Sequence, residues 1–202
     1  MEKSESMNLN YDFYKIQGQS AIPKKGKILI AEPFLNDTHF KRSIVLLTEH
    51  NKEGSVGFVL NKPVDLAVSD ILEDFPELAA DISMGGPVGT NTVHYLHTLG
   101  NAVPNSVRVM KNIYWGGDFN AIKSLAGAGA IGSQQLRFFL GYSGWRPNQL
   151  EEELAQNAWA VEDIEAWKVM NYTEESSWKA TLEELGDKYK MWLLTPETPN
   201  LN

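Results

Sequence analysis

The chain has 202 residues, contains no cysteine and carries a formal net charge of −8 at pH 7. A chain of this length suits one domain and buries roughly 70% of its unfolded surface, so it can fold without disulfides or bound metal. The absence of cysteine excludes disulfides, thiolate zinc sites, iron–sulfur clusters and cysteine nucleophiles, and it fits a reducing compartment.

The acidic charge lies mainly towards the C-terminal end. Residues 146–202 contain 12 acidic and 5 basic residues, whereas residues 1–145 contain 14 and 13. A protein that binds duplex nucleic acid neutralises phosphates with clustered Lys and Arg. We interpret the one basic run, Lys24-Lys25-Gly26-Lys27, as a solvated segment ahead of a strand. The sequence therefore argues against direct nucleic-acid binding.

Targeting and membrane signals are not apparent. Residues 1–5 are too polar for a signal peptide, and the apolar runs at 28–31 and 44–47 are too short for a bilayer, which takes about 20 residues. We therefore expect a cytoplasmic protein without a membrane partner. Residues 1–25 are expected to form an N-terminal arm, which adds an edge strand or lies across the body. Residues 26–202 are expected to form a single α+β domain.

The clearest local prediction is a β-hairpin. Residues 27–31 are typical of a buried strand, and two more apolar, β-branched runs follow at 43–50 and 55–60. The last two flank Asn51-Lys52-Glu53-Gly54, in which Asn and Gly suit a tight connection. We predict a hairpin with a four-residue turn.

The middle of the chain is predicted to contain short strands and two capped helices. Ser69 is expected to cap a short helix that stops at Pro76, and Asp118 to cap a longer helix that ends at Gly127. Further strands are predicted at residues 82–84, 92–96, 107–110 and 136–140. Strands that precede helices, joined by hairpins, favour the α+β class.

Residues 146–202 are predicted to be mainly helical. Pro147 suits the first turn of one helix, and Thr173 is expected to cap another that ends at Gly186 and buries one face (Trp178, Leu182 and Leu185). Core packing is expected for the tryptophans of this region, with a seam between identical subunits as the alternative (Trp159, Trp167 and Trp178).

Two motifs typical of enzymes are present only in part. The run Gly127-Ala128-Gly129-Ala130-Ile131-Gly132 matches a dinucleotide-binding pattern, but it follows a helix and precedes a strand, which is the reverse of the required order. The run Gly141-Tyr142-Ser143-Gly144-Trp145 resembles a nucleophile elbow, but Trp145 replaces the final glycine. All four histidines precede Ser143, so the hydrolase order of Ser, acid and His is absent. We interpret the first run as a connector and the second as a structural turn anchored by Trp145, and we expect no cofactor.

The histidines are also weak candidates for chemistry. His94 and His97 have a spacing that suits a metal on a helix, but their neighbours predict a strand, where they face opposite sides. We expect no metal site there, with one imidazole packed and the other in solvent. His50 lies beside the tight turn, where capping of the turn is favoured over a role as general base.

Two glycine pairs mark places where backbone can approach another group closely. Gly85-Gly86 precedes a proline, and Gly116-Gly117 leads into Asp118 and a helix start, where free amides can bind an anion. Two interpretations remain open. The pairs form a small-molecule or phosphate-like site, or they are sharp turns of a bent sheet in which Asp118 occupies the anion position.

The ordered motifs of the chain resemble the AlgH/YqgE family of bacterial proteins. The similar segments run from Gly26 to Gly186 and comprise Gly26–Ala31 with Pro33, Phe40–Leu47, Glu49-His50, Gly57–Pro63, Gly85–Val88, Gly116–Asp118, Gly141–Trp145, Gln149–Glu151, Glu153-Leu154 and Trp159. This chain has Pro147-Asn148 where a glycine or basic residue is expected before Gln149, a departure that affects the helix start. The resemblance implies an α+β fold whose bent, mixed sheet forms a pseudo-barrel, flanked by helices concentrated in the C-terminal third. It also implies an association with transcriptional control, without catalytic or DNA-reading residues to transfer.

These observations favour a non-catalytic regulatory or interaction protein that binds a protein or small-molecule partner, and a homo-oligomer is compatible with them. The alternative is an uncharacterised enzyme, such as a hydrolase that uses His50 or Asp118. No catalytic residue and no metal ligand is assigned. The candidate ligand-binding residues are Arg42, His50, Asn61, Gly85, Gly86, Gly116, Gly117, Asp118, Tyr142, Gly144, Trp145 and Gln149.

Overall fold

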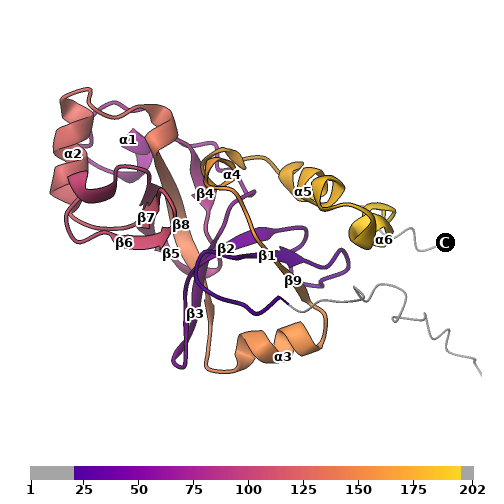
Figure 1. Cartoon of the computed structure of the whole chain (residues 1–202). Coiled ribbons are helices and arrows are strands. Elements are labelled where there is room, and N and C mark those ends of the chain that lie inside the picture. Colours follow the sequence, from indigo (N-terminus) through magenta and orange to yellow (C-terminus); the bar gives the residue numbers. More distant parts are fainter. Residues whose placement is uncertain (1–20, 197–202) are drawn as a thin grey trace, which may run out of the picture.

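Residues 21–196 are described by the computed structural model, and they form one bent, open sheet flanked by helices (Figure 1). Its nine strands are β1 (Ile28–Ala31), β2 (Ile44–Asn51), β3 (Gly54–Val59), β4 (Ile82–Met84), β5 (Val88–His97), β6 (Val107–Met110), β7 (Ile113–Trp115), β8 (Leu136–Trp145) and β9 (Trp159–Glu162). The strand order is β6-β7-β5-β8-β3-β2-β1-β9, and β4 lies parallel to β8 while the other pairs are antiparallel. The α+β class with a bent, mixed sheet is therefore confirmed.

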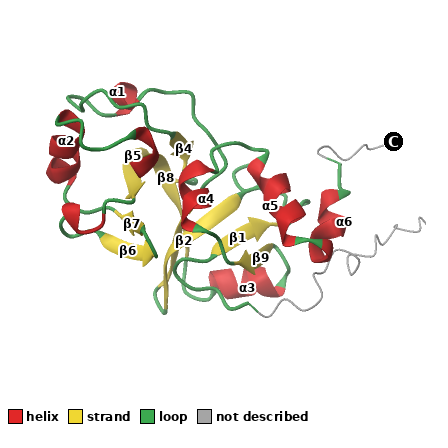
Figure 2. Cartoon of the chain, turned by 45° about the horizontal axis from the view of Figure 1, so that its top comes forward, coloured by secondary structure: helices red, strands yellow, loops and turns green. Residues whose placement is uncertain are grey.

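The helices are α1 (Val68–Ile71), α2 (Phe119–Gly127), α3 (Gln149–Ala155), α4 (Ala166–Asn171), α5 (Ser177–Leu185) and α6 (Lys190–Leu193). Four of these six lie in the C-terminal part of the described chain, as predicted. Figure 2 shows α1 and α2 beside the β4–β8 half of the sheet, while α5 and α6 lie at the β1–β9 half. None of the helices in residues 21–196 has the length and apolar character needed to cross a membrane.

The central strands are buried on both faces. Along β1, Ile28 and Ile30 pack in a cluster with Phe58, whereas Leu29 packs in a second cluster with Trp145. This arrangement follows from the alternation of side chains along a strand, and it explains why β1 is a continuous apolar run. The first cluster is completed by α4, α5 and α6, and the second by α3. A third cluster lies between α1, α2 and the strands β4, β5 and β8.

The strand β8 joins the two halves of the sheet. Its residues 136–140 pair with β4 and β5, and its residues 143–145 pair with β3. Between them Gly141 has a φ of +65°, and the pairing register shifts opposite it, between Val88 and Val93 of β5. Phe139 and Tyr142, three residues apart, both pack against the first cluster, as expected across a β-bulge.

Two sequence predictions about turns need correction. Residues 141–145 were expected to form a turn, but the bulge at Gly141 lets β8 continue to Trp145. Trp145 is nevertheless a buried packing anchor, as predicted. The β2–β3 hairpin is confirmed, but its connection consists of Lys52 and Glu53 alone, because Asn51 and Gly54 pair with each other.

The helix predictions are confirmed for α2 and are partly wrong elsewhere. The Asp118 carboxylate accepts hydrogen bonds from the amides of Asn120 and Ala121, as predicted for a cap. The short α1 begins after Ala67 rather than Ser69, because the carboxylate of Asp70 accepts a 2.8 Å bond from the Ala67 amide. Residues 127–132 connect α2 to β8, as expected from their order in the sequence.

The C-terminal region contains one strand that was not predicted. β9 lies within the supposedly helical region and pairs with β1, so it covers an edge that would otherwise be open. The helix α5 begins at Ser177, not after Thr173, and a turn precedes it, in which the amides of Ser177 and Trp178 donate to the carbonyls of Glu174 and Glu175. Gly186 ends α5 as predicted.

Other expectations concern the tryptophans and the chain ends. Trp159 and Trp178 are buried in the core, while Trp167 is 57% exposed. Of the predicted N-terminal arm, residues 1–20 lie outside the described residues.

Candidate functional site

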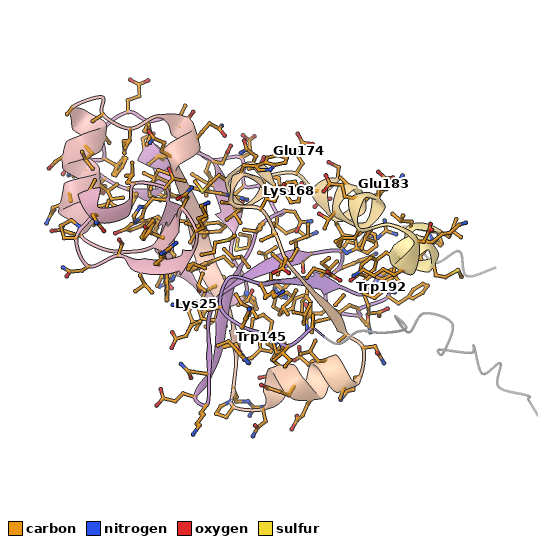
Figure 3. All side chains as sticks on the ribbon, in the orientation of Figure 1. Lys25, Trp145, Lys168, Glu174, Glu183 and Trp192 are labelled. Carbon is orange, nitrogen blue, oxygen red and sulfur yellow. The ribbon has the colours of Figure 1, made fainter. Side chains whose placement is uncertain are left out.

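The twelve predicted binding residues lie in four separate regions. His50, Trp145 and Gln149 lie at the hairpin end of β2; Gly85, Gly86, Tyr142 and Gly144 surround the bulge of β8; Gly116, Gly117 and Asp118 precede α2; Arg42 and Asn61 lie at the start of β2 and the end of β3. Figure 3 shows Trp145 beside α3, with the β1–β2 part of the sheet between it and Glu174, which precedes α5.

At the hairpin end, His50 contacts a serine and a carboxylate. Its Nδ1 lies 2.8 Å from Ser55 Oγ on the facing strand, and its Nε2 lies 3.7 Å from Glu151 Oε1. Ser55 is 5% exposed, whereas the Glu151 side chain is 52% exposed. The turn itself is capped by Asn51, whose Oδ1 accepts a 2.7 Å bond from the Glu53 amide. The expected capping role of His50 is therefore wrong, because its ring bonds across the strands instead.

The other two candidates at this end belong to a network around Glu153. Its Oε2 accepts hydrogen bonds from the indoles of Trp145 and Trp159, at 2.9 and 2.7 Å. Its Oε1 accepts a 2.9 Å bond from the Gln149 amide. Phe40 lies against both indole rings. Glu153 therefore fixes α3 to the sheet and satisfies buried N–H groups, which is a structural role.

Around the bulge, two backbone segments are in direct contact. A Cβ atom on Gly85 would overlap the carbonyl oxygen of Gly141, and one on Gly86 would overlap the carbonyl of Tyr142. Ser143 Oγ donates a 3.0 Å hydrogen bond to the Gly85 carbonyl. The space that Gly85 and Gly86 provide is thus filled by β8, so these two glycines allow strand packing at the bulge.

Protein groups also fill the space beside Gly117 and Asp118, whereas a Cβ atom on Gly116 would have no heavy atom within 4 Å. The Asp118 carboxylate binds the first amides of α2 and so occupies the position of an anion. Tyr95 donates a 2.7 Å hydrogen bond from its hydroxyl to the Gly117 carbonyl. A Cβ atom on Gly117 would lie 2.8 Å from the carbonyl oxygen of Pro104. Gly117 and Asp118 therefore form a tight, capped helix start.

His94 and His97 lie on β5 and face opposite sides of the sheet, as expected. His94 is half-buried, with its ring 5.4 Å from Phe58, and burial lowers its pKa. His97 is buried, its Nδ1 accepts from the Leu99 amide and its Nε2 donates to the Gly116 carbonyl. Burial lowers the pKa of His97, although the bond to Gly116 opposes that effect. The expected packed ring is His97, whereas the other ring, that of His94, is only partly in solvent because it also lies in an aromatic cluster.

Metal ligands do not gather in the described part of the chain. No group of three or more His, Cys, Asp or Glu side chains in residues 21–196 is arranged to hold an ion.

Arg42 and Asn61 form a clamp at the start of β2. Asn61 is fully buried; its Nδ2 donates a 2.9 Å bond to the Arg42 carbonyl and its Oδ1 accepts a 2.8 Å bond from the Ile44 amide. Arg42 has a φ of +51°, a left-handed conformation that disfavours side chains other than Asn, Asp and Gly. The other non-glycine residues of the described chain with positive φ are Asp74, Asn105, Asn112, Asn148 and Asn157. The clamp therefore holds an arginine where the backbone favours a smaller residue.

The Arg42 guanidinium reaches a basic recess beside α5. It lies 5.0 Å from the centroid of the Trp178 ring, and its Nη2 donates a 2.9 Å bond to the Thr195 carbonyl. The basic recess has a volume of about 550 Å³ and is lined by Thr38, Lys41, Arg42, Lys62, Glu175, Ser176, Trp178 and Lys179. Four of these side chains are cationic and one is acidic, in a chain whose net charge is −8.

Sequence reasoning placed only Arg42 of this set among the candidates. The other lining residues come from three segments that are distant in the chain, and no local motif connects them. Lys62 belongs to the run Gly57–Pro63 that resembles the family, next to Asn61, but nothing in the sequence of that run marks Lys62 as a binding residue.

Arg137 was also missed, although it is the most deeply buried cation of the described chain. Its side chain is 1% exposed and donates to the carbonyls of Val169, Tyr172 and Leu60 and to Ser83 Oγ. Burial lowers its pKa to about 9, so it stays protonated at pH 7. Arg137 therefore ties β8 to the C-terminal end of α4 and to the residues that follow β3.

Comparisons with known proteins agree with this fold. An AlgH-like family model matches residues 28–190. A UPF0301 protein of Bacteroides fragilis is 44% identical over 198 residues, which cover 97% of this chain and all of that protein. A UPF0301 protein of Chlorobaculum tepidum is 39% identical over 90% of this chain and 97% of its own length.

Two solved structures have the same architecture. The solution structure of the AlgH protein from Pseudomonas aeruginosa matches with a TM-score of 0.67 and 28% identity, over 88% of this chain and 97% of that one. A crystal structure of a Corynebacterium diphtheriae protein matches with a TM-score of 0.72 over 87% of this chain and 94% of that one, at 18% identity, which shows a shared fold. The family model covers most of the chain and the relatives align over nearly all of it, so this chain belongs to the AlgH-like family.

Proposed function

We propose that this chain is a non-catalytic regulatory or interaction protein of the cytoplasm, which acts by binding a protein or a small molecule. The observation that carries the proposal is the separation of the catalytic-type side chains. A catalytic site needs its acid, base and nucleophile within hydrogen-bond reach of one reacting group. Here Asp118 caps α2, Asn61 holds β2 and His50 bonds across the hairpin, each in its own region. His50 does contact a serine and a carboxylate, but that serine is buried in the strand ladder.

A regulatory role of this protein would be indirect. The resemblance to the AlgH/YqgE family associates it with transcriptional control, but the net charge of −8 disfavours a duplex, which is bound through phosphate neutralisation. We therefore propose that a protein or small-molecule partner, rather than DNA, is the direct target.

Native mass spectrometry of the protein purified from its own cytoplasm tests this proposal. The expected result is a mass above that of the chain, from a bound small molecule, a second protein or a second copy of the chain. The proposal would be contradicted by a bare chain in the spectrum together with no captured partner and no ligand that raises the melting temperature.

A second candidate function is hydrolysis at the hairpin end, favoured by the line of Ser55, His50 and Glu151. In the tautomer protonated on Nε2, His50 Nδ1 could accept the proton of Ser55 while Glu151 orients the ring. Against it, Ser55 is buried and lies in the ladder between β2 and β8, where backbone amides are already paired.

A fluorophosphonate probe distinguishes the two functions, since it labels activated serines. We expect no labelling of the native protein. Labelling that disappears in Ser55→Ala and in His50→Gln, while a Ser143→Ala variant still reacts, would establish the hydrolase and overturn the binding proposal.

A further inference from the structure

We propose that the basic recess binds a small molecule through a phosphate group. This inference rests on the proposed function, because it names the chemical class of the ligand. It concerns the surface between the β1–β2 connection, the residues that follow β3 and the start of α5.

Charge is the first argument. Lys41, Arg42, Lys62 and Lys179 line the recess with one acid, Glu175, which leaves three excess positive charges among the lining residues (four minus one). Glu175 pairs with Lys62 at 3.5 Å, and Glu183 lies 3.9 Å from Lys179. The volume of about 550 Å³ falls within the range of roughly 300–1,000 Å³ that is usual for ligand sites. A concave surface with one sign of charge concentrates oppositely charged ligands.

The conformation of Arg42 is the second argument. An arginine in the left-handed region is disfavoured relative to glycine, and such conformations persist where surrounding contacts enforce them. Asn61 enforces the left-handed conformation of Arg42, because its side-chain amide donates to the Arg42 carbonyl and its side-chain oxygen accepts from the Ile44 amide. The result is a guanidinium held over Trp178 at the wall of the recess.

The start of α5 adds to the positive electrostatic potential of the basic recess. Ser176 precedes the helix and makes no side-chain bond to its amides, whereas Asp118 makes two such bonds at the start of α2. Ser176 and Lys179 line the recess, so the positive end of the α5 dipole lies beside it. α5 is nine residues long, which is enough for its first turn to contribute.

The shape and surroundings narrow the ligand class. Trp178 is 2% exposed and is covered by Arg42, so the recess has no open ring on which a base could stack. Arg42 already donates to the Thr195 carbonyl and Lys62 pairs with Glu175, yet four cationic side chains carry more N–H groups than one carboxylate can accept, which favours the several oxygens of a phosphate or pyrophosphate. A long polyanion is disfavoured because the Glu183 carboxylate lies 3.9 Å from Lys179 at the edge of the recess. A compact phosphorylated molecule needs no open aromatic ring, supplies several oxygens and is not a long polyanion, so it fits the basic recess.

Calorimetric titration of the full chain with pyrophosphate, at ionic strength held constant with sodium chloride, tests the inference. We expect saturable binding of one pyrophosphate per chain and a melting temperature that rises with its concentration. The double variant Lys62→Gln/Lys179→Gln should bind at least tenfold more weakly. Glu175→Gln should bind more tightly, because it removes the one carboxylate of the recess.

Lys52→Gln/Lys111→Gln is the matched control, since it removes the same charge from exposed residues outside the recess. Its affinity should equal that of the native chain. The inference is overturned if pyrophosphate does not bind at about 10 mM, or if the control and the recess variant lose affinity equally.

The outcomes separate this inference from the proposed function. If pyrophosphate binds in the recess and is released as phosphate, the site stands but the non-catalytic function fails. If no anion binds while a protein partner is found by native mass spectrometry, the function stands and the inference fails.

Discussion

Replacing Arg137 tests how the C-terminal helices are held to the sheet. Arg137→Met keeps a long side chain but removes every donor. Three buried carbonyls, of Leu60, Val169 and Tyr172, then lose a charged partner. Each unsatisfied buried acceptor costs about 1–3 kcal/mol of folding free energy. Part of the total cost of the three acceptors is offset, because the variant no longer has to bury a charged group away from water.

We therefore expect Arg137→Met to lower the free energy of unfolding by about 3–5 kcal/mol, which is a large fraction of the roughly 5–15 kcal/mol typical of a domain. Urea denaturation followed by tryptophan fluorescence measures the change. Arg108→Met is the matched control, because Arg108 is exposed on β6, and it should change the free energy by less than about 0.5 kcal/mol. The reasoning is refuted if the two variants are equally stable.

Three further predictions concern other contacts. The melting temperature should fall as the pH drops below about 6.5, because burial lowers the pKa of His97 in the folded chain and the unfolded chain therefore binds a proton at a higher pH. In His97→Gln the melting temperature should depend less on pH, and an equal slope of melting temperature against pH in the two proteins would contradict the prediction. Gly85→Ala should destabilise by about 3 kcal/mol in chemical denaturation, because its Cβ overlaps the Gly141 carbonyl, whereas Gly127→Ala at the end of α2 should be neutral or stabilising. Glu153→Leu should lower stability by about 2–4 kcal/mol and shift the tryptophan emission, since it leaves three N–H donors without their acceptor; an unchanged spectrum and midpoint would show that the network is dispensable.

Features determined by local sequence could be predicted. The buried strands β1 and β2, the hairpin and the Asp118 cap of α2 each depend on a few neighbouring residues, and all three are present. The predictions failed where distant contacts decide the local structure. β9 is a strand because β1 offers it an edge.

The candidate site was predicted less well than the fold. Glycines 85 and 86 were correctly marked as places of close backbone approach, but the approaching group is β8 rather than a ligand. The basic recess assembles side chains from residues 38–42, residue 62 and residues 175–179, so no spacing in the sequence points to it. Asn61 was identified, but its role as a clamp on Arg42 needs the folded geometry.

Two-dimensional ¹H–¹⁵N NMR spectroscopy during a pyrophosphate titration tests most directly whether this protein works by binding an anion in the basic recess. We predict that the amide shifts of residues 38–42, 62 and 175–179 move together and saturate, while those of His50 and Ser55 stay fixed and the pyrophosphate is recovered unchanged. Shifts that are largest at His50 and Ser55, or an unperturbed spectrum, would contradict this account.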